Sequence, residues 1–326
     1  MAQRIGAGNT DGARNFARDS LILSVLLMAI VAVIGLLTID LVFSAIGATG
    51  TTLVQVKSFM TVFYPSALVL VIPMVSNGML RGAGDTRWPA IIMVIVAILN
   101  AALDPLLIFG LGPVPALGLQ GAAWATLLAR VVSVFIALGI LHYRERLISW
   151  SRPAWKGLVD SLRQIGQVGL PSATTNAVTP LATGLVTAVV AGFGDAAVAG
   201  LTTAMRIEMC ALLGVFALAV GSFPVMAQNY GAGHSERLLS ARKFILSTGV
   251  VISLIVAIPV YLFAPHIAGI FISGGPVQET ATNFLQIVPW SWPGFALVFM
   301  ISSIHTATGR PFLGASLTLV RLIVLL

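Results

Sequence analysis

The chain has 326 residues, of which 58% are hydrophobic and only 9% are charged, with a net charge of +7 at neutral pH. A soluble domain carries about 25% charged residues, so this composition excludes a protein with a water-facing charged shell. In a membrane protein, a basic excess indicates cytoplasmic loops rather than a nucleic-acid partner.

Long apolar runs dominate the chain from residue 20 onward. A membrane-spanning helix needs about 20 mostly apolar residues, and eight runs meet this length, with a partial ninth cut off by the chain end. The predicted spans are 20–43, 53–79, 88–110, 119–141, 167–191, 197–225, 244–264 and 281–304, then 312–326. We therefore predict an all-α polytopic membrane protein.

The loops between these spans differ sharply in charge. If residues 1–19 are cytoplasmic, most Lys and Arg residues fall in loops on that side, whereas the loops near 44–52, 111–118, 192–196 and 265–280 hold none. This asymmetry predicts a multi-pass protein of the inner or plasma membrane whose N-terminal end is cytoplasmic.

A short motif occurs twice in the chain. AQRIGAG at residues 2–8 is similar to AQNYGAG at 227–233, and six predicted spans separate the two copies. An even number of spans returns the chain to the same membrane face, so the repeat predicts two like-oriented, pseudo-symmetric helical bundles. The second copy follows two spans of its own bundle. We therefore expect a complete protein to have two more spans before residue 1, and the 326 residues alone not to transport.

Three regions follow from this organisation. We predict an N-terminal bundle of about four helices at 1–141, a cytoplasmic linker at 142–166, and a C-terminal bundle of about four and a half helices at 167–326. Apolar residues between 155 and 165 recur at helical spacing. The linker is thus either an interfacial helix lying on the cytoplasmic leaflet or a solvated basic connector.

Asp104 is the main functional candidate, because a charge inside a span is costly and is usually retained for function. Asn100 lies one helical turn earlier, and Pro105 follows and cannot donate a backbone hydrogen bond. Such a position can open the helix and leave carbonyl oxygens for a cation or a proton carrier. The alternative is a carboxylate that caps a broken helix near the outer interface.

The predicted fifth span carries a polar stripe at steps of three and four residues. Its members are Ser172, Asn176, Thr179, Thr183 and Thr187. They line one helix face, which is either the wall of a water-filled cavity or a helix–helix contact. Arg206 and Glu208, in the sixth span, are too close in sequence to face each other, and so either pair across helices or line the same cavity.

Several kinds of chemistry have no support in the sequence. Cys210 is the single cysteine, and the four histidines are far apart, so no disulfide and no metal cluster is predicted. No phosphate-binding GxxxxGK[ST] loop or HExxH pair occurs. We expect no catalytic residue, no metal and no resident cofactor, and therefore not an enzyme.

One stretch carries a family resemblance. LRGAGDTRWPA at 80–90 and LNAALDPLLIFGLGPVPALGLQGAAWATLLAR at 99–130 resemble the signature of the multidrug and toxic compound extrusion (MATE) family. The repeated AQ..GAG motif, GLP at 169–171 and RIE at 206–208 are also similar to that family.

The resemblance implies a monomeric transporter of two six-helix bundles around a central cleft. Such proteins export small, mostly cationic, drug-like compounds in exchange for Na⁺ or H⁺. By motif position, Asp104, Asn100 and Asn77 match the residues that assist a cation-binding aspartate of the family's first helix, which has no counterpart in these 326 residues. The substrate cavity is expected near Asn176, Thr179, Thr183, Arg206 and Glu208.

Two alternatives remain open at this point. A lipid-linked oligosaccharide flippase of related fold would need a strongly basic cleft, and the spans contain few cations. A non-transporting membrane scaffold or receptor would show no alternating access. The sequence names neither the substrate nor the coupling ion.

Overall fold

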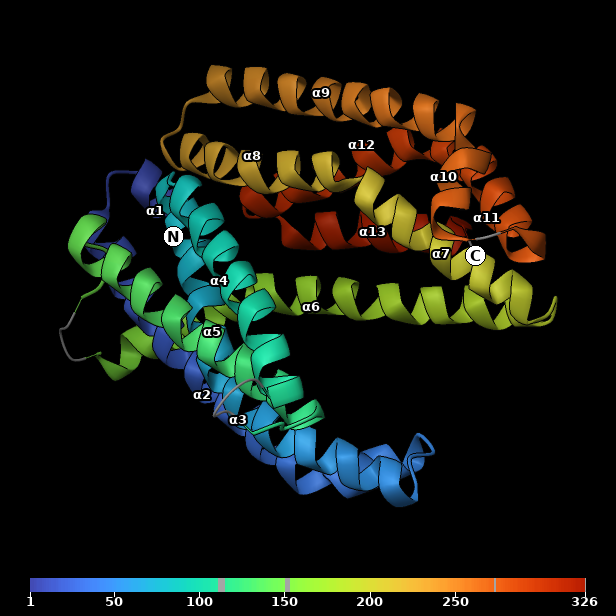
Figure 1. Cartoon of the computed structure of the whole chain (residues 1–326). Helices are drawn as coiled ribbons and strands as arrows, with labels where there is room; N and C mark the ends of the chain where they lie inside the picture. The colour runs from blue at the N-terminus through green and yellow to red at the C-terminus, as the bar shows by residue number, and fades with distance from the viewer. Residues whose placement is uncertain (111–114, 150–152, 273, 326) are drawn as a thin grey trace. The chain divides into compact units, whose positions relative to one another are not determined.

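The computed structural model describes residues 1–110, 115–149, 153–272 and 274–325, except the side chains of residues 179 and 321–325 (Figure 1). It divides into two compact units, Met1–Arg163 and Gln164–Leu326. The boundary falls within the predicted linker at 142–166. All regular elements among the described residues are helices, as the predicted fold class requires.

The first unit contains the helices drawn from blue to green in Figure 1. They are α1 (Ala2–Gly6), α2 (Thr10–Ala45), α3 (Gly50–Ala83), α4 (Arg87–Pro105), the π-turn η1 (Leu106–Gly110), α5 (Leu119–Gly139) and the π-turn η2 (Ile140–Arg144). Helix α6 (Trp155–Ala191) begins in this unit and continues into the second.

The second unit contains the remaining helices, drawn from yellow-green to red. They are α7 (Asp195–Ala211), α8 (Leu213–Gly231), α9 (Ser235–Leu262), α10 (Ala264–Phe271), α11 (Gly275–Ile287), the 3₁₀ turn η3 (Val288–Ser291), α12 (Trp292–Ala307) and α13 (Pro311–Leu325).

Among the described residues, eight helical stretches are long and apolar enough to cross a membrane, which confirms the predicted number. A shorter apolar helix, Pro311–Val320, lies where the sequence predicts a partial ninth span. The eight stretches are Thr10–Ala45, Gly50–Ala83, Arg87–Gly110, Leu119–Arg144, Trp155–Ala191, Leu213–Gly231, Ser235–Leu262 and Gly275–Ala307.

The structure differs from the predicted spans at the sixth. The predicted span 197–225 is divided at Leu212 into α7 and α8, and only α8 is long and apolar enough to span. Helix α7 has only 17 residues and carries Asp195, Arg206 and Glu208, so it is short and charged for a spanning segment.

The linker also differs from the prediction. The helical part of 142–166 is not a separate interfacial helix, because α6 runs without interruption for 37 residues from Trp155 to Ala191. Extending an existing helix adds a hydrogen bond per residue at little cost, and no proline lies between Trp155 and Leu170 to stop it. Pro171 and Pro180 lie inside α6 and do not end it.

Helix packing in the first unit depends on small residues. Helix α2 packs against α3, and α5 packs against both α3 and α4. The buried core includes Ala17, Leu80, Ile92, Ala129 and Ala137. Alanine and glycine at such contacts let helix backbones approach closely, which is how membrane helices gain packing energy.

The second unit has its own core around α12. This helix packs against α8, α9 and α13, while α7 packs against α11. Trp292 and Met300 of α12 are fully buried. A Cβ added to Gly200 of α7 would lie 2.7 Å from the carbonyl oxygen of Val277 on α11, so only glycine fits this contact.

The repeated motif has the same backbone geometry in both units. Gly8 and Gly233 both adopt a positive φ, of 74° and 73°. The next residues, Asn9 and His234, then donate their N–H to the carbonyl five positions earlier at 2.9 and 3.0 Å. This is a glycine-terminated helix end, and it precedes a long spanning helix in each unit.

A buried acid joins α2 to α6. Because Asn9 caps its start, α2 begins at Thr10, before the predicted position, and Asp19 lies inside the helix with only 2% of its surface exposed. The Asp19 carboxylate accepts hydrogen bonds from Arg18 Nη2 at 2.8 Å and from Ser161 Oγ at 2.9 Å. A buried carboxylate needs such partners, and they fix the start of α6 against α2.

The contact between α2 and α3 yields a test. A Cβ added to Gly35 would collide with the ring of Tyr64, so Gly35→Val is expected to lower the apparent melting temperature in detergent. Overpacking of this kind costs about 1–3 kcal/mol. Gly78→Val is the matched control, because an added Cβ there meets nothing within 4 Å. Equal stability of the two variants would contradict the close packing.

Candidate functional site

Asp104 lies near the end of α4, where the helix changes its winding. Helix α4 ends at Pro105, and the π-turn Leu106–Gly110 follows. Asp104 is half-buried, and its carboxylate makes no hydrogen bond or ion pair with any described residue. An acid that is partly buried in an apolar helix without a partner is unusual, because the charge is poorly solvated there.

Asn100 lies one turn before Asp104 and connects α4 to α5. Its Nδ2 donates to Thr126 Oγ1 at 3.4 Å, and both side chains are half-buried. The hydroxyl of Thr126 itself donates to the carbonyl of Ala122 at 3.0 Å. The structure therefore brings Asn100 and Thr126 together beside the end of α4.

Asn77 lies on α3 and at a different depth. The turn at 84–86 joins α3 to α4. At about 1.5 Å of rise per residue, Asn77 lies about 9 Å from that turn and Asp104 about 26 Å from it. The Asn77 Oδ1 atom is buried without a hydrogen-bond partner among the described residues, as are Ser76 Oγ and Arg130 Nε. Asn77 is thus a separate polar position, closer to the predicted cytoplasmic end.

A second feature is a cavity inside the second unit, with a volume of about 590 Å³. Helices α6, α8, α12 and α13 contribute its walls. Hydroxyl and amide side chains line one part of it: Ser172, Thr175, Asn176, Ser302, Ser303, Thr306 and Thr318. The described lining contains no charged side chain.

Aromatic rings form another part of this lining. The ring of Phe216 on α8 lies edge-to-face with Phe295 and Phe299 of α12, at centroid distances of 6.0 and 5.2 Å. Phe295 and Phe299 are stacked at 5.7 Å. Phe223 adds a further ring to the lining. The cavity therefore offers flat apolar faces next to neutral hydrogen-bonding groups.

These features match a known transporter family. A family model described as MatE matches residues 1–106 and 171–326 of the chain. The chain belongs to the MATE family. This confirms the resemblance in the sequence and identifies the fold as that of a membrane transporter.

Individual MATE relatives agree with this assignment. The chain is 34% identical over 334 residues to a FAD transporter of Shewanella oneidensis, covering 100% of the chain and 72% of the relative. It is 28% identical over 296 residues to the probable multidrug resistance protein NorM of Thermotoga maritima, covering 88% of the chain and 62% of the relative. A crystal structure of MATE in the straight conformation superposes with a TM-score of 0.86 at 30% identity, covering 99% of this chain and 72% of that one.

The cavity of this MATE protein includes part of the predicted polar stripe. Ser172 and Asn176 line it, whereas Thr183 is exposed and is not among its described lining residues. The side chain of Thr179 lies outside the described residues. The stripe is therefore a cavity wall over its first part.

Arg206 and Glu208 do not line this cavity in the described part of the chain. Arg206 is exposed, while Glu208 accepts a hydrogen bond at 2.9 Å from the indole N–H of the fully buried Trp292. Glu208 thus holds α7 to α12, which is the cross-helix alternative that the sequence leaves open.

Sequence reasoning missed two parts of these sites. The phenylalanines at 295 and 299 have the spacing of one helix face, but a lipid-facing row looks the same in sequence. Thr126 is one of two hydroxyl residues in the apolar helix α5, and it gives no signal of its own. Only the packing of α4 on α5 brings it to Asn100.

The Glu208–Trp292 hydrogen bond can be tested by stability. Glu208→Ala is expected to destabilise the protein by about 1–3 kcal/mol, because the indole N–H is left without an acceptor. Glu208→Gln keeps an amide oxygen at that place and should retain most of the stability. Thermal unfolding in detergent measures both. If the two variants were equally stable, the hydrogen bond would not hold α7 to α12.

Proposed function

We propose that the protein exports drug-like, mostly cationic and amphipathic compounds in exchange for Na⁺ or H⁺. Membership of the MATE family supports transport, and relatives named as multidrug resistance proteins support this class of cargo. The observation that carries the proposal is the uncharged, aromatic cavity inside the second unit.

The cavity suits drug-sized molecules in both volume and chemistry. Its volume of about 590 Å³ lies within the range of small-molecule sites, about 300–1,000 Å³. The faces of Phe216, Phe295 and Phe299 attract organic cations through the ring quadrupole and bury their apolar surface. Neutral hydroxyl groups can orient many different ligands, which favours broad selectivity.

Coupling to a cation is proposed to depend on Asp104. Its carboxylate lies half-buried without a partner, next to Asn100 and before the π-turn that starts at Leu106. Binding of H⁺ or Na⁺ would neutralise this charge, and carboxylate and amide oxygens are suitable ligands for a hard cation. The buried Oδ1 atom of Asn77 lacks a partner among the described residues. It would contact the cation at a second position along its path.

The charge of the loops supports the proposed orientation. We place the N-terminal end and the 142–154 loop on the cytoplasmic side of the inner or plasma membrane, because these segments carry the basic residues. The protein would then act as a monomer in the bilayer, with H⁺ or Na⁺ entering and the compound leaving.

A second candidate function is flavin nucleotide export. The relative that is 34% identical is named a FAD transporter, and it is matched over the whole chain. Stacked phenylalanines suit a flavin ring, but the described cavity lining offers no cation for the phosphates. The same lack of Lys and Arg disfavours a lipid-linked oligosaccharide flippase, whose cargo carries phosphate.

Ethidium efflux tests the proposed coupling. In cells that lack their own multidrug pumps, the protein with the two spans expected before residue 1 restored should lower ethidium accumulation when a Na⁺ or H⁺ gradient is present. Asp104→Asn removes the titratable, anionic group and should reduce efflux to the level of cells without the protein.

The matched control is Asp40→Asn, because Asp40 is exposed and paired with Lys57 at 2.7 Å. This variant should retain efflux. Gradient-dependent efflux by the Asp104→Asn protein at the normal rate would refute the coupling role. Inhibition of ethidium efflux by FAD, with FAD itself exported, would favour the flavin alternative.

A further inference from the structure

A hollow near the start of α2 has a polar part and an apolar part. The polar part, about 650 Å³, includes Asp11, Arg14 and Asn15 of α2. The apolar part, also about 650 Å³, includes Leu21 and Ile22 further along the same helix. The two parts share the residues His142, Tyr143, Ile148 and Ser149, so they adjoin each other within the first unit.

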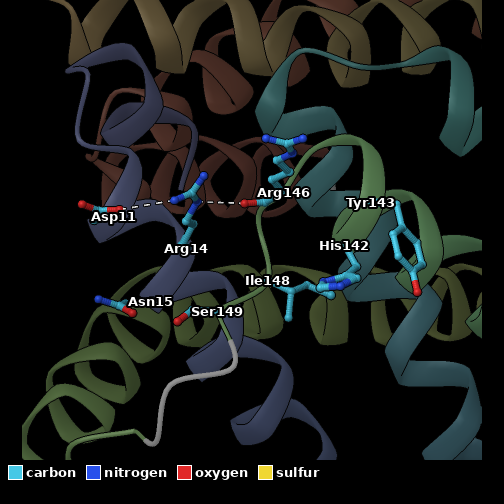
Figure 2. A pocket seen from close by; sticks show the side chains of 8 residues that line it. All are labelled: Asp11, Arg14, Asn15, His142, Tyr143, Arg146, Ile148 and Ser149. Carbon is cyan, nitrogen blue, oxygen red and sulfur yellow. Dashed lines mark hydrogen bonds and ion pairs between the residues drawn. The ribbon is translucent and has the colours of Figure 1, made fainter.

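Two arginines, Arg14 and Arg146, line the polar part. Figure 2 shows Arg14 between Asp11 and the loop that contains Arg146, with His142 and Ile148 across the hollow. Arg14 Nε donates to the carbonyl oxygen of Arg146 at 2.8 Å, which fixes the guanidinium in place. Its Nη1 lies 3.5 Å from Asp11 Oδ1, a loose and exposed ion pair that contributes little.

The positive charge near the apolar part is already compensated. Arg18 lies at the junction of the two parts, but its Nη2 is 2.8 Å from the buried carboxylate of Asp19. An anionic group in the hollow would therefore find its cationic partners at Arg14 and Arg146, the two arginines that line the polar part. Further along α2 from Arg14, the lining becomes apolar, with Leu21, Phe135 and Leu138.

This order of groups follows the profile of a membrane leaflet. Polar and basic residues occupy the first turns of α2, and apolar residues follow on the same face three to four positions apart. Tyr143, which is 81% exposed, lies at the transition between the two parts, where amphipathic rings favour the membrane interface. In the proposed orientation this level is the cytoplasmic leaflet, where anionic lipids attract basic segments.

We propose that this hollow binds one anionic phospholipid, with its phosphate at Arg14 and an acyl chain along Leu21, Phe135 and Leu138. The lipid would bridge α2 and the end of α5, and so stabilise the first unit. A free anion would fill only the polar part, and a zwitterionic lipid such as phosphatidylcholine would bring a headgroup cation that Arg14 and Arg146 repel. The proposal relies on the orientation given above but not on the transported compound.

Delipidated, detergent-purified protein provides the test. Thermal stability is measured while phosphatidylglycerol, phosphatidylcholine or glycerol phosphate is added. Phosphatidylglycerol should raise the melting temperature in a saturable way, whereas phosphatidylcholine and glycerol phosphate should have little effect. Arg14→Gln should weaken the apparent affinity for phosphatidylglycerol by at least about tenfold, because a charge-assisted hydrogen bond is lost.

Two further variants distinguish a phosphate contact at Arg14 from a general attraction of anionic lipid to basic surface. Arg14→Lys keeps the charge and should retain most of the affinity, whereas a loss as large as that of Arg14→Gln would refute a phosphate contact. Arg237→Gln, on the exposed start of α9, should leave the affinity unchanged. An equal loss in that variant would indicate general surface attraction and overturn the proposal. Equal stabilisation by phosphatidylcholine or by glycerol phosphate would also overturn it.

Discussion

The constraint on which the structure depends is that backbone polar groups must be paired within each helix, because lipid offers them no partner. Long continuous helices satisfy this constraint, and they leave few places where a polar side chain is tolerated. Asp19 is paired with Arg18 and Ser161, and Glu208 is paired with Trp292. Against this background the carboxylate of Asp104, which has no partner among the described residues, is distinctive. No contact among the described residues gives a structural reason for an acid at this position.

Glycine turns of the same backbone geometry end helices in both units. Gly8 and Gly233 end a helix in the same left-handed conformation, and Gly84 and Gly309 do so after the next two spanning segments, at φ of 101° and 81°. Each turn returns the chain into a new helix without exposing carbonyl groups to lipid. Each unit then builds its own core from small residues. Two separately packed bundles are the arrangement that transporters built from parallel repeats use.

Much of the fold could be predicted from the sequence, because hydropathy and loop charge report directly on membrane embedding. The eight spans and the repeat follow from such local patterns. The division at Leu212 does not, because 197–225 reads as one apolar run despite Arg206 and Glu208. The continuity of α6 from the linker into the fifth span does not follow from the sequence either. Residues 155–165 have an amphipathic pattern and 167–191 a mostly apolar one, so they read as two separate segments.

The sites were less predictable, because they depend on contacts between distant segments. Asp104 and Asn100 stand out as polar residues in an apolar span, but Thr126 becomes relevant only through α4–α5 packing. The phenylalanine cluster joins Phe216 to residues about 80 positions away. The family motif groups Asn77 with Asp104. The bounds of α3 and α4 show that the two residues lie at different distances from the turn between these helices.

The central claim is that two like-oriented bundles cross the membrane, and cysteine accessibility tests it most directly. In a Cys210→Ser background, single cysteines are placed at Glu145 and Glu236, and at Thr51 and Phe193. A membrane-impermeant maleimide should label the second pair in intact cells, and the first pair only after the cells are opened. Labelling of Glu145→Cys and Glu236→Cys from opposite sides of the membrane would contradict the two-bundle arrangement.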